Sequence, residues 1–141
     1  MIYLSKVEER GLNMEISHLD HLVLTVKDIE ATCAFYVKVL GMKEIVFGAG
    51  RKALVFGSMK INLHEYGHEY EPKAKQPTPG SADLCFITDV AITEVIEHIE
   101  TFAIRIEEGP VKRTGACGEI ISIYIRDPDE NLIEISNYVK P

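Results

Sequence analysis

The chain repeats one pattern of residues at a constant spacing, and this repeat constrains its fold more than any other feature. Leu24 and Phe86 lie 62 positions apart, as do Met42 and Ile104. Each copy opens with an alternating segment typical of a half-buried strand and continues with apolar residues at helical spacing. A repeat of this size indicates a duplicated supersecondary unit. The sequence therefore predicts two matching halves within 141 residues, about the length of one domain.

The first half predicts one strand, one helix and three further strands. The opening strand is expected near 18–26, and Asp28 stands where a helix N-cap is favoured. Gly41 ends the helical pattern. This order of elements is a βαβββ unit. Its last three strands, separated by glycine turns, are expected at 42–47, 52–56 and 60–66.

The second half repeats this order after a proline-rich segment. A strand is expected at 83–87 and an amphipathic helix over 92–102. We predict a strand at 104–107, followed by a loop at 108–118 that contains Arg113. The remaining strands form a hairpin at 120–125 and 132–136.

These elements predict an α+β fold made of tandem βαβββ units that form a cup-shaped mixed sheet. One helix covers one face of each sheet, so the opposite face must surround a cavity or pack on its twin. The expected organisation is an extension at 1–15, a first unit at 16–66, a linker at 67–80 and a second unit at 81–138.

Charge, hydropathy and cysteine usage exclude several classes of function. The net charge of −7 disfavours nucleic-acid binding, which needs a basic face. No apolar run approaches the roughly 20 residues of a membrane span, and no signal-peptide pattern is present. Cys33, Cys85 and Cys117 are an odd number without close pairs, which indicates a reducing cytoplasm. Cys33 and Cys85 are expected in the core, and Cys117 in a loop. We therefore expect a cytoplasmic protein that binds a small molecule.

Short motifs in both halves resemble a known superfamily. Leu19-Asp20-His21-Leu22 opens the first strand, and Asp127-Pro128-Asp129 precedes Asn131-Leu132-Ile133-Glu134 in the last hairpin. Ala34-Phe35-Tyr36 and Leu40-Gly41-Met42 mark the first helix and its exit. With the two βαβββ units, these motifs resemble the vicinal oxygen chelate superfamily over residues 17–138. That superfamily holds glyoxalase I, fosfomycin-resistance thiol transferases, extradiol dioxygenases and bleomycin-binding proteins.

The resemblance implies a divalent metal held by His21, Asp83 and Glu134. His21 matches the first-strand ligand of the family, and Glu134 matches the acid in the last strand. Asp83 stands where histidine or glutamine is usual, and Asn62 stands where glyoxalase I has an acidic ligand. The resemblance also implies a homodimer in which His21 and Glu134 of one site belong to different protomers. The metal would be Mn, Fe, Zn, Ni or Mg.

The chemistry of these residues can be judged without the family. Glu134 shares a strand face with Leu132 and Ser136, where an unpaired carboxylate is costly. If Asp83 and Glu134 face one cavity, their repulsion raises the pKa of at least one. A divalent cation removes that cost, and two carboxylates favour the harder ions.

Four further residues are candidates for substrate binding. His64 and Asn62 lie two positions apart and therefore share a strand face. Arg113 can contact a substrate anion or be an ordinary loop charge, and Tyr124 can line the same cavity. His64 can instead be an accessory metal ligand, and Asp83 can bond a loop amide. His98 lies in the second predicted helix, outside its apolar positions, and is expected to be solvated.

The expected function is that of a glyoxalase-like metal-dependent enzyme of lyase or isomerase type. The ion would chelate neighbouring substrate oxygens and stabilise an enolate or alkoxide, and Glu134 would move the proton. Two alternatives remain open. One is a metal-free protein that binds a small molecule, as bleomycin-resistance proteins do. The other is a non-haem iron dioxygenase, which would need His64 as its second histidine.

Overall fold

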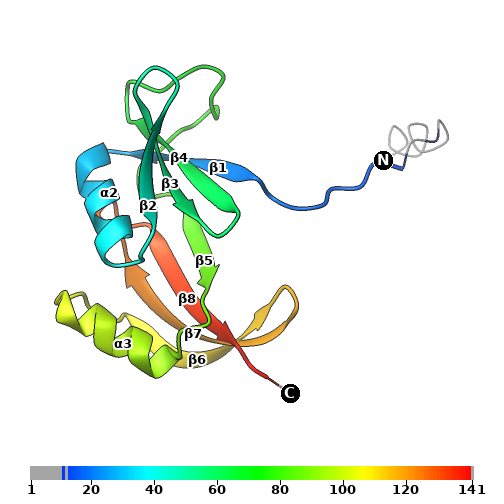
Figure 1. The fold of residues 1–141 in the computed structure, drawn as a ribbon, viewed down its shortest axis with the longest axis vertical. Helices are drawn as coiled ribbons and strands as arrows, with labels where there is room; N and C mark the ends of the chain where they lie inside the picture. Colours follow the sequence, from blue (N-terminus) through cyan, green and yellow to red (C-terminus); the bar gives the residue numbers. More distant parts are fainter. Residues whose placement is uncertain (1–10, 12, 141) are drawn as a thin grey trace.

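The structure is a computed structural model that describes residue 11 and residues 13–140. Its first half is a four-stranded mixed sheet with one helix (Figure 1). The strand order is β1-β4-β3-β2, with β1 parallel to β4 and the other pairs antiparallel. The elements are β1 (His21–Val26), α2 (Ile29–Lys38), β2 (Lys43–Phe47), β3 (Arg51–Phe56) and β4 (Met59–Glu65).

The second half repeats this topology strand for strand. The sheet order is β5-β8-β7-β6, again with the first pair parallel and the other pairs antiparallel. The α+β fold predicted from the repeat, with paired βαβββ units, is therefore confirmed. The elements are β5 (Asp83–Ile87), α3 (Ile92–Thr101), β6 (Glu108–Gly115), β7 (Gly118–Arg126) and β8 (Leu132–Tyr138).

Local sequence explains where α2 begins and ends. The Asp28 carboxylate accepts a hydrogen bond from the backbone N–H of Ala31 at 3.1 Å, as expected of an N-cap. Gly41 follows the helix with a φ of 70°, a conformation that favours glycine. The helix buries Cys33 and Tyr36 against the sheet.

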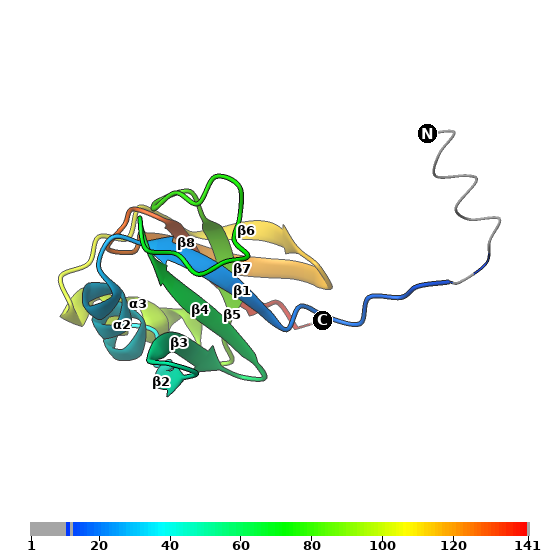
Figure 2. The same cartoon turned by 90° about the horizontal axis from the view of Figure 1, so that it is seen from above.

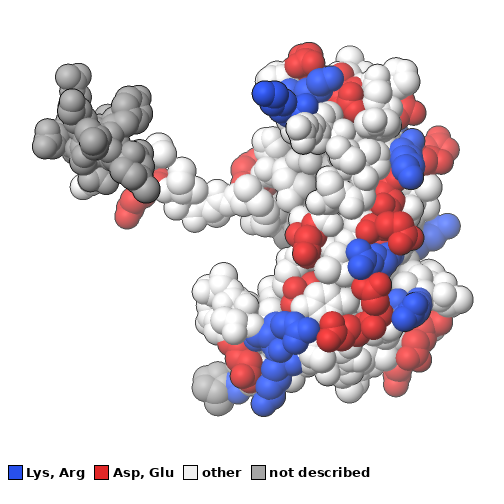
Figure 3. Space-filling view, turned by 180° about the vertical axis from the view of Figure 1, so that it is seen from behind, with Lys and Arg blue, Asp and Glu red and all other residues white. Residues whose placement is uncertain are grey.

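The two units share one apolar core. Both helices lie on the same side of the molecule (Figures 1 and 2). The aliphatic faces of β1 and β4 and those of β7 and β8 contribute to a single cluster of buried side chains. On the side shown in Figure 3, acidic and basic side chains are interspersed. The whole chain has a net charge of −7. The largest fully buried apolar members of the core are Tyr36, Leu54, Ile61, Leu63, Ile99, Ile123, Ile125 and Ile133.

The Asp127-Pro128-Asp129 turn joins the two units. Asp127 accepts hydrogen bonds from the backbone N–H groups of Asp129 and Asn131, both at 2.9 Å, and from the Asn131 side chain at 2.8 Å. The Tyr36 hydroxyl of the first unit donates to the same carboxylate at 2.7 Å. Asp129 accepts from the backbone N–H of Lys27 at 3.2 Å. The motif that carried much of the family resemblance therefore has a structural role.

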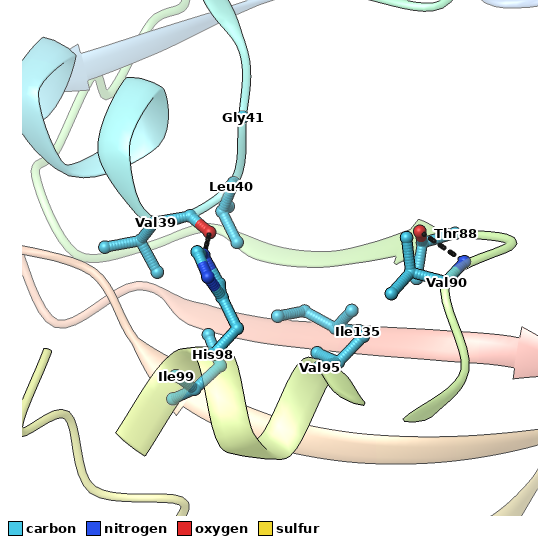
Figure 4. Close-up of a pocket in the computed structure, with 9 residues that line it drawn as sticks. All are labelled: Val39, Leu40, Gly41, Thr88, Val90, Val95, His98, Ile99 and Ile135. Carbon is cyan, nitrogen blue, oxygen red and sulfur yellow. Dashed lines mark hydrogen bonds between the residues drawn. The ribbon is translucent and has the colours of Figure 1, made fainter. Parts of the chain in front are cut away.

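A second contact between the units involves His98, which was expected to be solvated. Its Nε2 lies 2.8 Å from the carbonyl oxygen of Val39, at the end of α2 (Figure 4). A carbonyl only accepts, so this nitrogen carries the proton. His98 is exposed, as predicted, and its hydrogen-bond partner comes from a residue far away in the sequence. A hollow of about 320 Å³ lies beside the contact.

The predicted loop at 108–118 is largely a strand, and the predicted strand at 104–107 is not one. β6 covers residues 108–115 and pairs antiparallel with β7. It is the edge strand of its sheet and is mostly exposed, so it lacks the alternation of a half-buried strand. Gly109 lies close to β7, because an added Cβ would come within 2.4 Å of the Ser122 carbonyl oxygen. Gly109 and Gly115, two of the glycines that suggested a loop, instead permit close strand packing.

The segments outside the sheets differ in their contacts. Residues 67–80, expected as a linker, partly fold back over the first sheet, where the Tyr70 ring lies 5.5 Å from the His64 ring. The predicted extension at 1–15 lies mostly outside the described residues. Residues 13–20 form no helix or strand and lead away from the body of the molecule (Figure 1). None of the helices in the described part of the chain is long and apolar enough to span a membrane.

Candidate functional site

Each sheet has one face that its helix does not cover, and these faces carry the candidate site residues. The two-residue period of the strands, combined with their register, assigns the side chains to each face. The first free face consists of His21, Val23, Thr25, Lys43, Ile45, Phe47, Arg51, Ala53, Val55, Lys60, Asn62 and His64. The second free face consists of Asp83, Cys85, Ile87, Glu108, Val111, Arg113, Ile120, Ser122, Tyr124, Arg126, Leu132, Glu134, Ser136 and Tyr138.

His21 opens the first free face with its ring oriented by a carboxylate. Its Nδ1 lies 2.8 Å from Asp20 Oδ2, and its side chain is 44% exposed. The hydrogen bond from His21 lowers the pKa of Asp20. Because Nδ1 donates to the carboxylate, the lone pair of the neutral ring remains on Nε2. Metal-ligating histidines commonly have this arrangement.

Asn62 occupies the middle of the first free face, level with Val23 of β1. The residue is only 6% exposed, and its Oδ1 is buried without a hydrogen-bond partner among the described residues. Such an unmet acceptor costs about 1–3 kcal/mol. An amide oxygen suits either a hard cation or a ligand that donates a hydrogen bond. The position that lacks the family's acid thus still has an available oxygen.

His64 lies at the far end of the first free face and is almost fully buried. Its Nε2 is 3.2 Å from Arg51 Nη2, and the Arg51 guanidinium carbon is 4.4 Å from the Tyr70 ring centroid. Burial lowers the pKa of His64, and the nearby Arg51 charge lowers it further. The ring is therefore held in its neutral form by its surroundings. Sequence analysis selected His64 but not Arg51 or Tyr70.

Glu134 lies on the second free face, where neighbouring serines hold it. The Ser122 hydroxyl donates to Glu134 Oε2 at 2.5 Å, and Ser122 also contacts the Ser136 hydroxyl at 2.7 Å. Both serines are fully buried. Glu134, Cys85 and Arg113 help to line a hollow of about 380 Å³. The carboxylate is thus accessible and oriented.

Cys85 is not in the core, where the sequence placed it. It lies directly opposite Glu134 in the pairing of β5 with β8, and the residue is exposed. Removal of water from the thiol raises its pKa, the hydrogen bond with Ser136 lowers it, and the charges of Glu134 and Asp83 raise it again. Strand alternation places Cys85 on the same face as Asp83, a signal that the apolar neighbours obscured.

Arg113 and Tyr124 form a linked pair beside Glu134. Arg113 Nε donates to the Tyr124 hydroxyl at 3.0 Å, and its Nη2 lies 3.4 Å from Glu108. Burial raises the pKa of Tyr124, although the bond from Arg113 lowers it. On the same face, Arg126 contacts Glu107 at 3.0 Å. Both arginines of this region therefore already have an acidic partner.

The predicted metal ligands are not brought together within one chain. In the part of the chain that the structure describes, no three His, Cys, Asp or Glu side chains are close enough to hold a metal ion. His21 and Asn62 lie on the first free face, whereas Asp83 and Glu134 lie on the second. Each face holds part of a donor set that fits a divalent ion: an imidazole and an amide oxygen, or two carboxylates.

Comparisons with known proteins agree with this architecture. Residues 18–135 match the model of the Glyoxalase/Bleomycin resistance protein/Dioxygenase superfamily. The virulence protein STM3117 of Salmonella typhimurium is 61% identical over 129 residues, covering 92% of this chain and 90% of that protein. Its crystal structure matches with a TM-score of 0.88 over 89% of this chain and 100% of that chain.

Two further relatives share the domain. The glyoxalase domain-containing protein RDO1 of Mycosarcoma maydis is 55% identical over 125 residues, covering 89% of this chain and 70% of that protein. A mutant of the fosfomycin resistance protein FosX of Listeria monocytogenes, solved with Mn(II) and 1S,2S-dihydroxypropylphosphonic acid, is 26% identical. It matches with a TM-score of 0.60 over 89% of this chain and 93% of that chain. The chain belongs to the glyoxalase/bleomycin resistance protein/dioxygenase superfamily.

Proposed function

We propose that this protein is a glyoxalase-like, metal-dependent enzyme whose site forms between two copies of the chain. In this proposal, His21 and Asn62 of one protomer and Asp83 and Glu134 of a second protomer hold a divalent ion. One observation carries the proposal: two incomplete donor sets lie on separate free faces of the same chain. Stacking the first free face of one copy on the second free face of another completes the set twice in a symmetric dimer.

The composition of the two faces supports this pairing. Val23 on the first face and Ile87 on the second are 46% and 48% exposed, which is unfavourable unless another surface covers them. The first free face carries Arg51 and Lys60 and no acidic residue. The second carries Asp83, Glu108 and Glu134, and its two arginines, Arg113 and Arg126, contact Glu108 and Glu107. Opposite charges across an interface favour the correct partner and orientation.

The residues around the proposed ligands indicate their roles. Asp20 orients the His21 ring, and Ser122 holds one oxygen of Glu134. The second oxygen of Glu134 remains able to take a proton from a substrate carbon and return it. When bound, the ion would stabilise negative charge that develops on the substrate oxygens.

The donor set also limits the choice of ion. One imidazole, one amide and two carboxylates suit Mn²⁺, Fe²⁺, Zn²⁺, Ni²⁺ or Mg²⁺, and the oxygen-rich composition favours the harder members. The FosX relative was solved with Mn(II). Manganese is therefore the first ion to test.

The decisive experiment measures metal content in mixed dimers. Protein purified without chelator should contain metal, and His21→Ala and Glu134→Gln homodimers should each lose most of it. A mixed dimer of these two variants, isolated with two different affinity tags, should regain one intact site. His68→Ala is the matched control, because His68 is an exposed histidine paired with Glu65 at 3.3 Å and lies outside both free faces.

The mixed dimer distinguishes the possible outcomes. If the site formed within one chain, each chain of the mixed dimer would carry one defect and no metal would return. Full metal retention in both single variants would remove His21 and Glu134 from the ligand set. Substrate screening would then use the metal-loaded protein with hemithioacetals, epoxides and catechols.

A metal-free binding protein is the second candidate. The Arg51 guanidinium carbon lies 5.1 Å from the Phe47 ring centroid and 4.4 Å from that of Tyr70, and a cation grouped with aromatic rings is a candidate contact for an organic ligand. Absence of metal together with tight binding of an organic ligand would favour this candidate. The iron dioxygenase gains less support, because the Nε2 lone pair of His64 already accepts a hydrogen bond from Arg51.

A further inference from the structure

A hollow of about 320 Å³ lies where the two units meet, and none of its lining residues belongs to either free face (Figure 4). The first unit forms one wall with the residues that follow α2, and the second unit forms the rest. Ligand sites occur preferentially at such junctions. The lining residues are Val39, Leu40 and Gly41 of the first unit, and Thr88, Val90, Val95, His98, Ile99 and Ile135 of the second.

The wall of this hollow is mainly aliphatic and carries no permanent charge. Val95, Ile99 and Ile135 are at most 8% exposed and belong to the shared core. None of the described residues that line the hollow is an acid, a lysine or an arginine. The hollow on the second free face differs, because Glu134 and Arg113 line it. A charged ligand would lose hydration at the unit junction without meeting an opposite charge. The hollow therefore fits a neutral and mainly apolar molecule.

Thr88 gives the hollow a hydrogen-bond donor at one end. Its hydroxyl oxygen accepts the backbone N–H of Val90 at 3.1 Å. The hydroxyl proton points elsewhere, and an acceptor placed in the hollow can take it. His98 lies at the opposite end, where its Nε2 donates to the Val39 carbonyl oxygen at 2.8 Å (Figure 4). A ligand with one acceptor oxygen thus matches the Thr88 end.

Hydrogen bonds hold both walls of the hollow in place before anything binds. The Asn137 side chain donates to the carbonyl oxygens of Thr88 and Val90 at 2.8 and 2.9 Å and accepts the Ile92 N–H at 2.8 Å. Val90 is 52% exposed, so a bound molecule would cover apolar surface that now meets water. A preformed site of this kind binds without the cost of ordering its own wall.

We propose that this hollow binds a small, neutral, mainly apolar molecule with one hydrogen-bond acceptor, which bridges the two units. Its volume is near the lower end of the roughly 300–1,000 Å³ of ligand pockets, which suits a single ring or a short chain. Ile135 lines the hollow, whereas its neighbour Glu134 lies on the second free face, because successive strand residues point to opposite sides. The site is therefore separate from the proposed metal site and does not depend on it.

The test is an NMR titration of the full chain, without added metal, with cyclohexanone, a neutral ring that has one carbonyl oxygen. The methyl signals of Leu40, Val90 and Val95 should shift and saturate with a Kd of about 1 mM or lower, as expected for a probe of this size. Cyclohexanecarboxylate has the same ring with a charge and should bind at least about tenfold more weakly. Saturating cyclohexanone should also raise the melting temperature, because it binds only the folded protein.

Two variants test the wall of the hollow. Val90→Asp introduces a charge and should weaken cyclohexanone binding about tenfold or more. Val46→Asp is the matched control and should bind like the wild type, since Val46 is a 63% exposed valine of β2 outside the hollow. Thr88→Val keeps the side-chain shape without the hydroxyl and should weaken binding roughly threefold to tenfold.

Each other outcome overturns the proposal. Equal weakening in both aspartate variants would indicate a general effect of charge, and equal affinity for the carboxylate would overturn the choice of a neutral ligand. Shifts confined to residues outside the hollow would place the probe elsewhere. Failure of cyclohexanone to bind, together with a lower mass of Val90→Asp in solution, would show that a second copy of the chain occupies the hollow. Thermal unfolding checks that Val90→Asp is folded. If it is not, Val90→Gln serves instead, with the same expectation.

Discussion

The two βαβββ units have the same topology but opposite chemistry on their free faces. Among the residues that the structure describes, Arg51 and Lys60 on the first free face have no acidic partner, and the Asn62 oxygen accepts no hydrogen bond. On the second, Glu134 is held by Ser122, and the nearby arginines contact glutamates. One face thus has polar groups that lack protein partners, whereas the other has polar groups that are already oriented.

This difference shows which part of a duplicated unit is free to diverge. The helix-facing sides of both sheets must remain aliphatic, because they form one shared core. The free faces carry no such packing constraint, so each can acquire different functional groups. A basic face and an acidic face are also complementary, which suits a site that needs both. Four changes test this comparison.

The largest effect should come from the turn that holds the two units together. Asp127→Ala removes the acceptor of four hydrogen bonds from buried groups and should lower the free energy of unfolding by at least about 3 kcal/mol. Urea denaturation measures the free energy of unfolding of each variant. Tyr36→Phe removes only one of the four bonds and should cost about 1–2 kcal/mol. A stable Asp127→Ala protein would mean that the units do not depend on this turn.

Ser122→Ala tests whether the orientation of Glu134 matters. Loss of the 2.5 Å bond should weaken metal binding about 10- to 100-fold, the usual effect of removing a group that orients a ligand. Competition with a chelator measures the affinity. Ser81→Ala is a suitable control, because Ser81 is exposed, donates to the Thr78 carbonyl and lies outside both free faces. Unchanged affinity would argue that Glu134 binds the metal without help or does not bind it.

His98→Ala tests the second contact between the units. The variant loses the 2.8 Å bond to the Val39 carbonyl and should be about 1 kcal/mol less stable. His18→Ala should leave stability nearly unchanged, since His18 is exposed and its side chain bonds the neighbouring Ser17 at an exposed position. Thermal unfolding distinguishes the two. Equal stability would leave the Asp127 turn as the main polar link.

The smallest effect concerns pH and the second free face alone. The hydrogen bond from Arg113 lowers the pKa of Tyr124, while burial and the charge of Glu134 raise it. Arg113→Gln should therefore shift the ionisation of Tyr124 to still higher pH. Ultraviolet absorbance of tyrosinate, compared with a Tyr124→Phe protein, follows this group. A shift to lower pH would show that Arg113 does not stabilise the phenolate.

Much of the fold was predictable, because its signals are local. The repeat and the alternation of β1, β4 and β8 placed His21, Asn62, His64 and Glu134 on free faces correctly. The sequence did not predict β6, because an exposed edge strand has no apolar alternation. Cys85 was misplaced because its aliphatic neighbours suggested burial, whereas strand alternation turns it to the other side.

The partners of the site residues were not predictable. The Arg51 guanidinium carbon lies 4.4 Å from the ring centroid of Tyr70, which lies in a segment that the sequence indicates only as a linker. Ser122 reaches Glu134 because of the register of two antiparallel strands. Nothing in the sequence near either residue indicates that the two side chains are hydrogen-bonded.

The sequence by itself determined the duplicated βαβββ scaffold and, for most residues of β1, β4 and β8, the side of the strand on which they lie, since hydrophobic periodicity and turn residues act over a few positions. Only the tertiary structure decided which of those side chains meet. Such contacts depend on strand register, on the return of residues 66–80 over the first sheet, and on the separation of the two free faces within one chain.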